Sequence, residues 1–265
     1  MGGYGQEQGI RGVRGMATIA IGDIHGNLRA LDDLLCKVLA ELNPEDVLVF
    51  LGDYIDRGPS SRGCLERIIR LREEADFQVV ALQGNHEYWM LRSFRDHTCH
   101  YWFLGLEAFQ TIASYSVEAA SALRVEVERA GPALLETPLP YEIFFDLLPS
   151  AHLQFLQNLV MYHRTKDVAC VHGDFPLELL FLPPEATIFP LEMDGFPDQY
   201  RGEDRIVYGH WSNADEDTNG WPLPCVKPNR TYGIDTIAKG VLTAMRFPDG
   251  KIFQSERYQL NRARA

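Results

Sequence analysis

Carboxylate, amide and imidazole side chains recur at one kind of position in this chain, directly after a short apolar run. The central example is the segment Gly52-Asp53-Tyr54-Ile55-Asp56-Arg57-Gly58-Pro59, which follows the apolar residues 47–51. A short apolar run that ends in a turn cluster is typical of a buried strand. Two aspartates and an arginine are therefore expected where a strand gives way to a loop, which is where open α/β sheets bind ligands.

Four further segments repeat this arrangement. Residues 18–21 lead into Gly22-Asp23-Ile24-His25, and residues 77–82 lead into Gly84-Asn85-His86-Glu87. Two later runs end at His172 and at Gly209-His210; each motif alone is ordinary, because Asp, Asn and Gly are common turn residues. Five such sites in one chain, all offering oxygen or imidazole ligands, favour a metal centre over a set of unrelated turns.

The spacing of apolar residues predicts the elements that position these loops. Asn27 can cap a helix whose apolar residues recur at helical spacing from Leu28 to Leu42, and a second helix is expected from Ser60 or Ser61. Strands alternate with these helices in the order βαβαβ, and the connecting loops are short. This pattern predicts parallel strands with right-handed crossovers.

The rest of the chain predicts a helical insertion and a second sheet. Strand signals stop between residues 95 and 135, where helical stretches rich in aromatic residues predict an all-helical insertion. Near the carboxyl end, runs on both sides of Asp249-Gly250 predict a hairpin, from which we expect a second sheet stacked on the first. The prediction is an α/β protein with two stacked mixed β-sheets flanked by helices. We expect one domain over residues 16–258, a disordered leader over 1–15 and a tail over 259–265.

Composition limits the classes of partner. The chain has 265 residues and a net charge of −12, which argues against a protein that follows a nucleic-acid backbone. No run reaches the length of a membrane span, and the start lacks the apolar core of a signal peptide. Five scattered cysteines without a Cys-x-x-Cys pair are typical of reduced thiols, so a cytoplasmic location is expected.

The motifs resemble those of the calcineurin-like metallophosphoesterases of the phosphoprotein phosphatase type. The segments 22–26, 52–58 and 84–87 match the three amino-terminal signatures of that family, and His172 and Gly209-His210 match the two later ones. The resemblance covers residues 16 to about 258 and is closest to the small bacterial serine/threonine phosphatases. It implies a four-layer αββα sandwich.

The resemblance also implies two divalent metal ions. Manganese is the metal that the family favours, and iron and zinc are alternatives. Asp53 would bridge the two ions. The other implied ligands are Asp23 and His25 for the first ion, and Asn85, His172 and His210 for the second. Such a pair of ions would supply a metal-bridging hydroxide that attacks phosphorus directly.

Three further residues would complete the catalytic set that the resemblance implies. Arg57 would bind the phosphoryl oxygens. His86 would protonate the leaving alkoxide as general acid, oriented and kept cationic by Asp56. The implied reaction is hydrolysis of phosphoserine or phosphothreonine in a protein, or of a small phosphate ester.

Two other functions remain open. A neighbouring branch of the family, the symmetrical dinucleoside (diadenosine) tetraphosphate hydrolases, shares Gly-His-Trp at residues 209–211 but lacks an acidic residue at the position of Asp56. A metal-binding scaffold without catalysis is the third possibility, and the presence of Asp56, Arg57 and His86 argues against it.

Departures from the family pattern concern four residues. Asp174 follows His172-Gly173 where the family usually has Ala-Gly, which adds a carboxylate beside a candidate ligand. The second phosphate-binding arginine of the family has no clear match, and Arg201 and Arg205 are the candidates. Asp235 is interpreted as the end of a strand, because the glycine that normally follows that stretch is absent.

Overall fold

The computed structural model describes residues 16–173, 197–212 and 214–258. The expected leader over residues 1–15, the tail over 259–265 and Asp174 lie outside these described residues.

The first sheet contains the three strands that the βαβαβ pattern predicted. Strands β1 (Thr18–Ile21), β2 (Val47–Phe50) and β3 (Gln78–Ala81) are parallel neighbours. Two antiparallel strands, β11 (Thr243–Phe247) and β12 (Ile252–Gln254), extend the sheet in the order β12-β11-β1-β2-β3. The carboxyl ends of β1, β2 and β3 therefore lie along one edge of the sheet.

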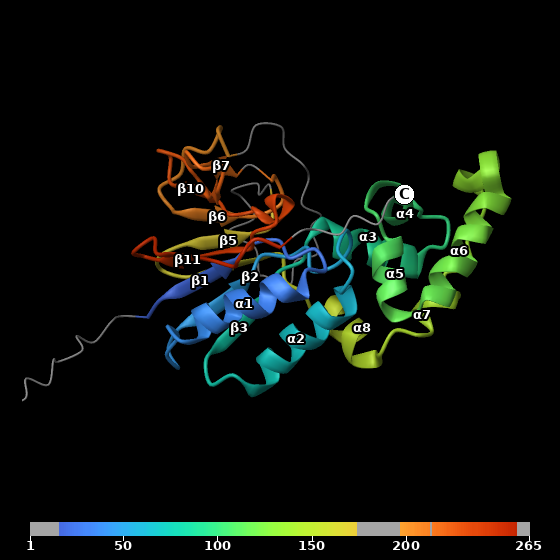
Figure 1. Ribbon diagram of the computed structural model, residues 1–265, viewed down its shortest axis with the longest axis horizontal. Helices are drawn as coiled ribbons and strands as arrows, with labels where there is room; N and C mark the ends of the chain where they lie inside the picture. The colour runs from blue at the N-terminus through green and yellow to red at the C-terminus, as the bar shows by residue number, and fades with distance from the viewer. Residues whose placement is uncertain (1–15, 174–196, 213, 259–265) are drawn as a thin grey trace, which may run out of the picture.

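The second sheet lies over the first and is also mixed (Figure 1). Its order is β4-β5-β6-β10-β9, with β5, β6 and β10 parallel to one another. Its strands are β4 (Tyr162–Arg164), β5 (Ala169–Val171), β6 (Ile206–Tyr208), β9 (Cys225–Val226) and β10 (Thr231–Gly233). A separate two-stranded sheet pairs β7 (Asp215–Glu216) with β8 (Pro222–Leu223).

The hairpin around Asp249-Gly250 forms as expected, but it belongs to the first sheet. Strand β11 pairs with β1, with Thr18 opposite Phe247, and β12 pairs with β11. The inference that this hairpin builds the second sheet was therefore wrong. The turn residues specify the hairpin locally, whereas its partner is chosen by packing of a strand from the opposite end of the chain.

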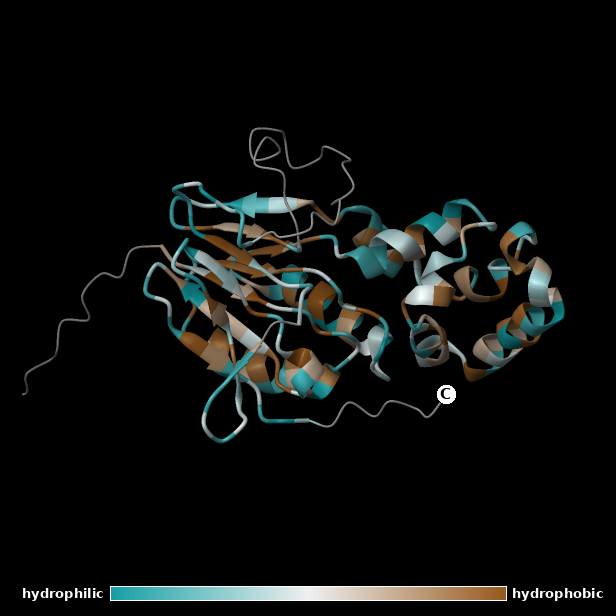
Figure 2. Ribbon diagram, turned by 90° about the horizontal axis from the view of Figure 1, so that it is seen from above, coloured by the Kyte–Doolittle hydropathy of each residue, from teal (hydrophilic) through white to brown (hydrophobic). Residues whose placement is uncertain are grey.

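Alternating residues of the strands supply two separate cores. Ile19 and Phe50 point toward α1 (Leu28–Leu39) and α2 (Ser61–Glu74), which cover the outer face of the first sheet. The alternate residues of the same strands, such as Ala20 in β1 and Val49 in β2, point to the opposite face and pack against the second sheet in a distinct cluster. Figure 2 shows the same hydrophobic concentration along the strands. As expected, the Asn27 side chain accepts a hydrogen bond from the Ala30 N–H and caps α1.

The remaining helices gather at one end of the sheets (Figures 1 and 2). The first of them is α3 (Asn85–Arg95), which follows β3 directly. The others are α4 (Tyr101–Gly105), α5 (Phe109–Tyr115), α6 (Val117–Ala130), the 3-10 helix η1 (Gly131–Glu136), α7 (Glu142–Phe145) and α8 (Ser150–Gln157). A short 3-10 helix, η3 (Ile237–Lys239), follows β10.

The expected fold class is confirmed: two five-stranded mixed sheets are stacked and flanked by helices. On the outer face of the second sheet, the described residues contribute an aromatic cluster that includes Tyr162, Tyr200 and Tyr208. Among the described helices, none combines the length and the apolar character that a membrane span requires.

Candidate metal centre and active site

The side chains expected to do chemistry converge at the carboxyl ends of strands from both sheets. Asp23 and His25 follow β1, and Asp53 follows β2. Asn85 and His86 open α3 after β3. From the second sheet, His172 follows β5 and His210 follows β6. The two stacked sheets thus deliver their ligand-bearing loops to a common region.

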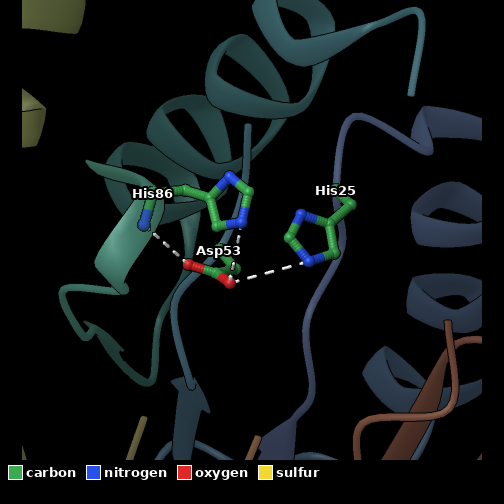
Figure 3. Close-up of side chains that lie close together, drawn as sticks. All are labelled: His25, Asp53 and His86. Atoms are coloured by element: carbon green, nitrogen blue, oxygen red, sulfur yellow. Dashed lines mark hydrogen bonds and ion pairs between the residues drawn. The ribbon is translucent and has the colours of Figure 1, made fainter. Parts of the chain in front are cut away.

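Asp53 is the centre of this cluster. Its Oδ2 lies 3.6 Å from His25 Nε2 and 3.7 Å from His86 Nε2, so both rings face the same carboxylate oxygen and lie edge to face against each other (Figure 3). Its Oδ1 lies 3.4 Å from His172 Nε2. Ligand atoms of His25, Asp53 and His86 lie within 4.8 Å of one another, and so do those of Asp53, His172 and His210. A single buried carboxylate is therefore shared by two groups of potential metal ligands.

The backbone fixes which nitrogen of two histidines faces this centre. His25 Nδ1 lies 3.0 Å from the carbonyl oxygen of Ile55, and His172 Nδ1 lies 2.9 Å from that of Leu51. A carbonyl only accepts, so each Nδ1 carries the proton and each neutral ring turns an Nε2 lone pair inward. Burial lowers the pKa of both histidines well below the usual value, which keeps the rings neutral.

These lone pairs face other acceptors. His25 Nε2 is a buried nitrogen without a hydrogen-bond partner among the described residues. His172 Nε2 lies 3.1 Å from Asn85 Oδ1, which is also 3.0 Å from His210 Nδ1. Imidazole nitrogens and amide and carboxylate oxygens thus converge in a way that a cation would satisfy.

Three buried carboxylates add negative charge to the same region. The pKa values of Asp23 and Asp53 are raised well above the usual range and that of Asp235 is also raised, in each case chiefly by burial. Repulsion from Asp235 and Asp53 raises the pKa of Asp23 further, while Arg57 acts in the opposite direction. Buried carboxylates at this density are normally neutralised by cations. The residues present therefore fit divalent metal ions.

Asp23 orients the loop of the second sheet. Both of its side-chain oxygens accept the backbone N–H of His210 at 3.0 Å, and its Oδ2 lies 3.9 Å from His25 Nε2. A Cβ placed on Gly209 would overlap Asp23 Oδ1, so only glycine allows this approach. The carboxylate therefore contacts a candidate ligand from each sheet.

His86 and Asp56 form a buried pair beside the cluster. His86 Nδ1 lies 2.7 Å from Asp56 Oδ2, and its Nε2 lies 3.4 Å from Arg57 Nη2. Burial raises the pKa of Asp56 to about 8 and, with the field of Arg57, lowers that of His86 well below its usual value. These directions differ from the expectation that Asp56 keeps His86 cationic. One proton shared along the hydrogen bond satisfies both groups.

Several site residues adopt left-handed backbone conformations that are unfavourable for residues with a Cβ. Such strain costs on the order of 1–3 kcal/mol for each residue and persists where surrounding contacts enforce it. The residues and their φ angles are His25 (46°), Asp53 (53°), Asp56 (67°), Arg57 (61°) and His210 (66°).

Glu87 supplies the contacts that hold the central loop, a role the sequence analysis did not assign. Its carboxylate accepts the N–H groups of Asp53 at 3.0 Å, Tyr54 at 2.8 Å and Ile55 at 3.3 Å. It also accepts the Gly84 N–H at 3.1 Å. The side chain is fully buried, and burial together with the charge of Asp56 raises its pKa to about 7. The Gly84-x-x-Glu87 spacing of a capping box is the signal that points to it.

Asp235 does more than end a strand. It is buried, and its Oδ2 accepts the N–H of Ser212 at 2.7 Å and the Ser212 hydroxyl at 2.9 Å. Ser212 lies two residues after His210 in the same loop, so Asp235 ties that loop to the end of β10. Its Oδ1 has no hydrogen-bond partner among the described residues.

The two arginines considered for phosphate binding lie elsewhere. Arg205 precedes β6, at the opposite end of that strand from His210, and donates to the backbone carbonyl of Asp167 at 3.4 Å. Arg201 donates to the carbonyl oxygens of Asp198 and Tyr200 in the turn before it. The structure does not bring either side chain to the cluster.

Comparisons with known proteins identify a family and several relatives of this chain. The family model of the calcineurin-like phosphoesterases matches residues 16–238. An asymmetrical bis(5'-nucleosyl)-tetraphosphatase, PrpE of Bacillus mycoides, is 28% identical over 247 residues, which cover 86% of this chain and 89% of that protein. Serine/threonine-protein phosphatase 1 of Salmonella typhimurium is 35% identical over 120 residues, which cover 44% of this chain and 50% of that protein.

Solved structures share the fold at low sequence identity. A protein serine/threonine phosphatase from Saccharomyces cerevisiae aligns with a TM-score of 0.53 at 12% identity, covering 92% of this chain and 81% of that one. A cold-active protein tyrosine phosphatase of Shewanella aligns with a TM-score of 0.52 at 17% identity, covering 91% and 80%. On the strength of the family match over most of its length, the chain belongs to the calcineurin-like phosphoesterases.

Proposed function

We propose that this protein is a metal-dependent phosphatase that hydrolyses phosphoserine and phosphothreonine esters. The observation that carries the proposal is the buried hydrogen bond between His86 and Asp56 beside the metal ligands. An alkoxide is a poor leaving group at neutral pH and gains most from protonation by a general acid. A terminal nucleotide leaves as a stable anion and needs such an acid much less.

The proposal includes two divalent metal ions, manganese in the first instance, with iron or zinc as alternatives. When bound, they would activate water for in-line attack and neutralise charge on the phosphoryl group. Asp53 would be shared between them. The other proposed ligands are Asp23, His25, Asn85, His172 and His210.

The protein's own groups would then bind the ester and move the proton. Arg57 carries a guanidinium 3.4 Å from His86 Nε2 and would bind phosphoryl oxygens next to that nitrogen. His86, protonated at both ring nitrogens in the substrate-bound enzyme, would donate the Nε2 proton to the departing alkoxide while Asp56 accepts a hydrogen bond from Nδ1. Burial of the pair excludes bulk water from this transfer.

A second candidate is the hydrolysis of dinucleoside tetraphosphates. The observation that favours it is the PrpE relative, whose similarity extends over 86% of this chain. That relative is an asymmetrical enzyme, whereas the sequence motifs alone suggested the symmetrical branch. A similarity to a symmetrical enzyme of Janthinobacterium covers 27% of this chain.

A comparison of substrates with one metal-analysed sample tests these proposals. Purified protein with manganese is offered a phosphothreonine peptide, p-nitrophenyl phosphate and diadenosine tetraphosphate, and the Asp53→Asn variant serves as the inactive control. We expect the highest kcat/KM for the phosphopeptide and loss of turnover in the variant, because Asp53 contacts both ligand groups.

The products separate the outcomes. Faster cleavage of diadenosine tetraphosphate to ATP and AMP would replace the first candidate with the asymmetrical hydrolase, and ADP alone would indicate the symmetrical one. If the metal-loaded protein hydrolyses none of the three compounds, the third possibility remains, a metal-binding scaffold without catalysis.

We also propose a cytoplasmic location for this enzyme. All five cysteines lie in the described part of the chain, and each is a free thiol. Free thiols at scattered positions are typical of a reducing compartment.

A further inference from the structure

Two helices between α3 and α7 each contribute one side chain that contacts the active site. Trp102 lies on α4 and Thr111 on α5, and both side chains are fully buried. Both contact Asp56, which lies in the loop after β2. The helical region is therefore joined to the catalytic loop by side chains far apart in the sequence.

Each oxygen of the Asp56 carboxylate has its own donor from these helices. The Trp102 indole N–H donates to Oδ2 at 2.9 Å, and the Thr111 hydroxyl donates to Oδ1 in a short hydrogen bond. His86 Nδ1 shares Oδ2 with the indole. With both oxygens engaged, the carboxylate cannot rotate without breaking a buried hydrogen bond.

Thr111 also holds the backbone of Asp56. Its Oγ1 accepts the Asp56 N–H at 2.8 Å, and Ser61 Oγ accepts the same N–H at 3.1 Å. The two hydroxyl oxygens lie 3.0 Å apart, and because the Thr111 proton is committed to the carboxylate, Ser61 is the donor between them. This network stabilises a residue whose φ of 67° is unfavourable.

Packing alone accounts for the burial of Trp102 but not for the direction of its N–H. The indole ring packs against Phe103, Phe144 and Phe145, with centroids 5.2, 5.7 and 6.1 Å away. A phenylalanine would fill much of the same apolar space. The indole nitrogen is the part of the side chain that the active site uses.

We propose that Trp102 and Thr111 are positioning residues for the His86–Asp56 pair, and that they determine how well the enzyme cleaves esters with poor leaving groups. The two donors fix the carboxylate, the carboxylate fixes the His86 ring, and the ring directs Nε2 between Asp53 and Arg57. The helical region thereby sets the range of accepted leaving groups. This inference rests on the proposed phosphatase function.

The test compares the dependence of rate on the leaving group. Thr111→Val removes the hydroxyl and keeps the shape, whereas Thr111→Ser keeps the hydroxyl. Thr231→Val is the control for a general loss of stability, because it removes another fully buried threonine hydroxyl. Thr231 lies at the start of β10, at the opposite end of that strand from Asp235. Each manganese-loaded variant is assayed with O-phosphoserine and with p-nitrophenyl phosphate.

We expect Thr111→Val to lower kcat for O-phosphoserine by about tenfold or more, since general acids contribute on the order of 10²–10⁴ in rate and only part of this is lost. The loss on p-nitrophenyl phosphate is expected to be about threefold or less, because a nitrophenolate needs little protonation. We expect KM to stay near that of the parent enzyme. In Thr111→Ser, the ratio of kcat for O-phosphoserine to kcat for p-nitrophenyl phosphate is expected to return to the parental value. Trp102→Phe is expected to lower this ratio, as Thr111→Val does.

Equal losses on the two esters, or equal losses in Thr111→Val and Thr231→Val, would overturn the positioning role. A parent enzyme that cleaves p-nitrophenyl phosphate but no alkyl phosphate would overturn the proposed function instead. The two failures are thus distinguishable in one set of rates.

Discussion

Replacing Glu87 by alanine is expected to destabilise the protein strongly, because one carboxylate satisfies four backbone N–H groups. These donors belong to Asp53, Tyr54, Ile55 and Gly84. All four residues lie in the two loops that carry the central carboxylate and the start of α3. Among the described residues, these four N–H groups have no other acceptor.

The magnitude follows from the number of donors left unpaired. A buried donor without a partner costs on the order of 1–3 kcal/mol. If water enters the polar space left by the side chain and pairs with half of the four donors, two remain, and the loss is about 2–6 kcal/mol. Against a typical total of about 5–15 kcal/mol, such a loss is severe.

Urea unfolding of the chelator-treated protein measures this loss directly. Glu66→Ala is the matched control, because Glu66 is exposed and pairs with Arg62 on the surface of α2. Exposed ion pairs contribute about 0–1 kcal/mol. A Glu87→Ala variant that loses no more free energy of unfolding than Glu66→Ala would refute the reasoning. We also expect weaker manganese binding, because Asp53 loses its backbone anchor.

Three further predictions concern other contacts. Gly209→Ala would force a Cβ into Asp23 Oδ1 and is expected to abolish tight manganese binding in calorimetry; parental affinity would contradict the argument. Asp235→Asn keeps the size but weakens the tie to the His210 loop, so metal content is expected to fall with little change in Tm, and full content would count against that tie. Cys36 is exposed and is expected to react with a thiol reagent in the native protein, whereas burial raises the pKa of Cys64 and should keep it unreactive until unfolding. Rapid native modification of Cys64 would disprove this.

The sequence was most informative about features that are specified by residues close together in the chain. The positions of Asp23, Asp53 and Asn85 after apolar runs identified which strand ends would meet, because carboxyl ends of parallel strands in one sheet share an edge. The caps and apolar spacing of the first helix were similarly readable, and Asn27 caps α1 as expected. These features depend on neighbours within a few residues.

Features that depend on distant partners escaped the sequence analysis. Glu87 has the spacing of an ordinary capping box, yet three of its four donors lie more than thirty residues earlier in the chain. The roles of Trp102 and Asp235 also come from contacts between separate loops and helices. The same reason explains the hairpin: Asp249-Gly250 specifies the turn, while pairing with β1 is settled by tertiary packing.

Because the proposed ligands are divided between two stacked sheets, bound cations would act as a cross-link as well as a reaction centre. Side chains on β1, β2 and β3 loops would share ions with side chains on β5 and β6 loops. An ion that binds only the native state raises the free energy of unfolding with its concentration, by RT ln(1 + [M]/Kd). The concentration of available metal would therefore determine the stability of the folded enzyme. When the metal is scarce, the protein would unfold more readily and would lose its activity.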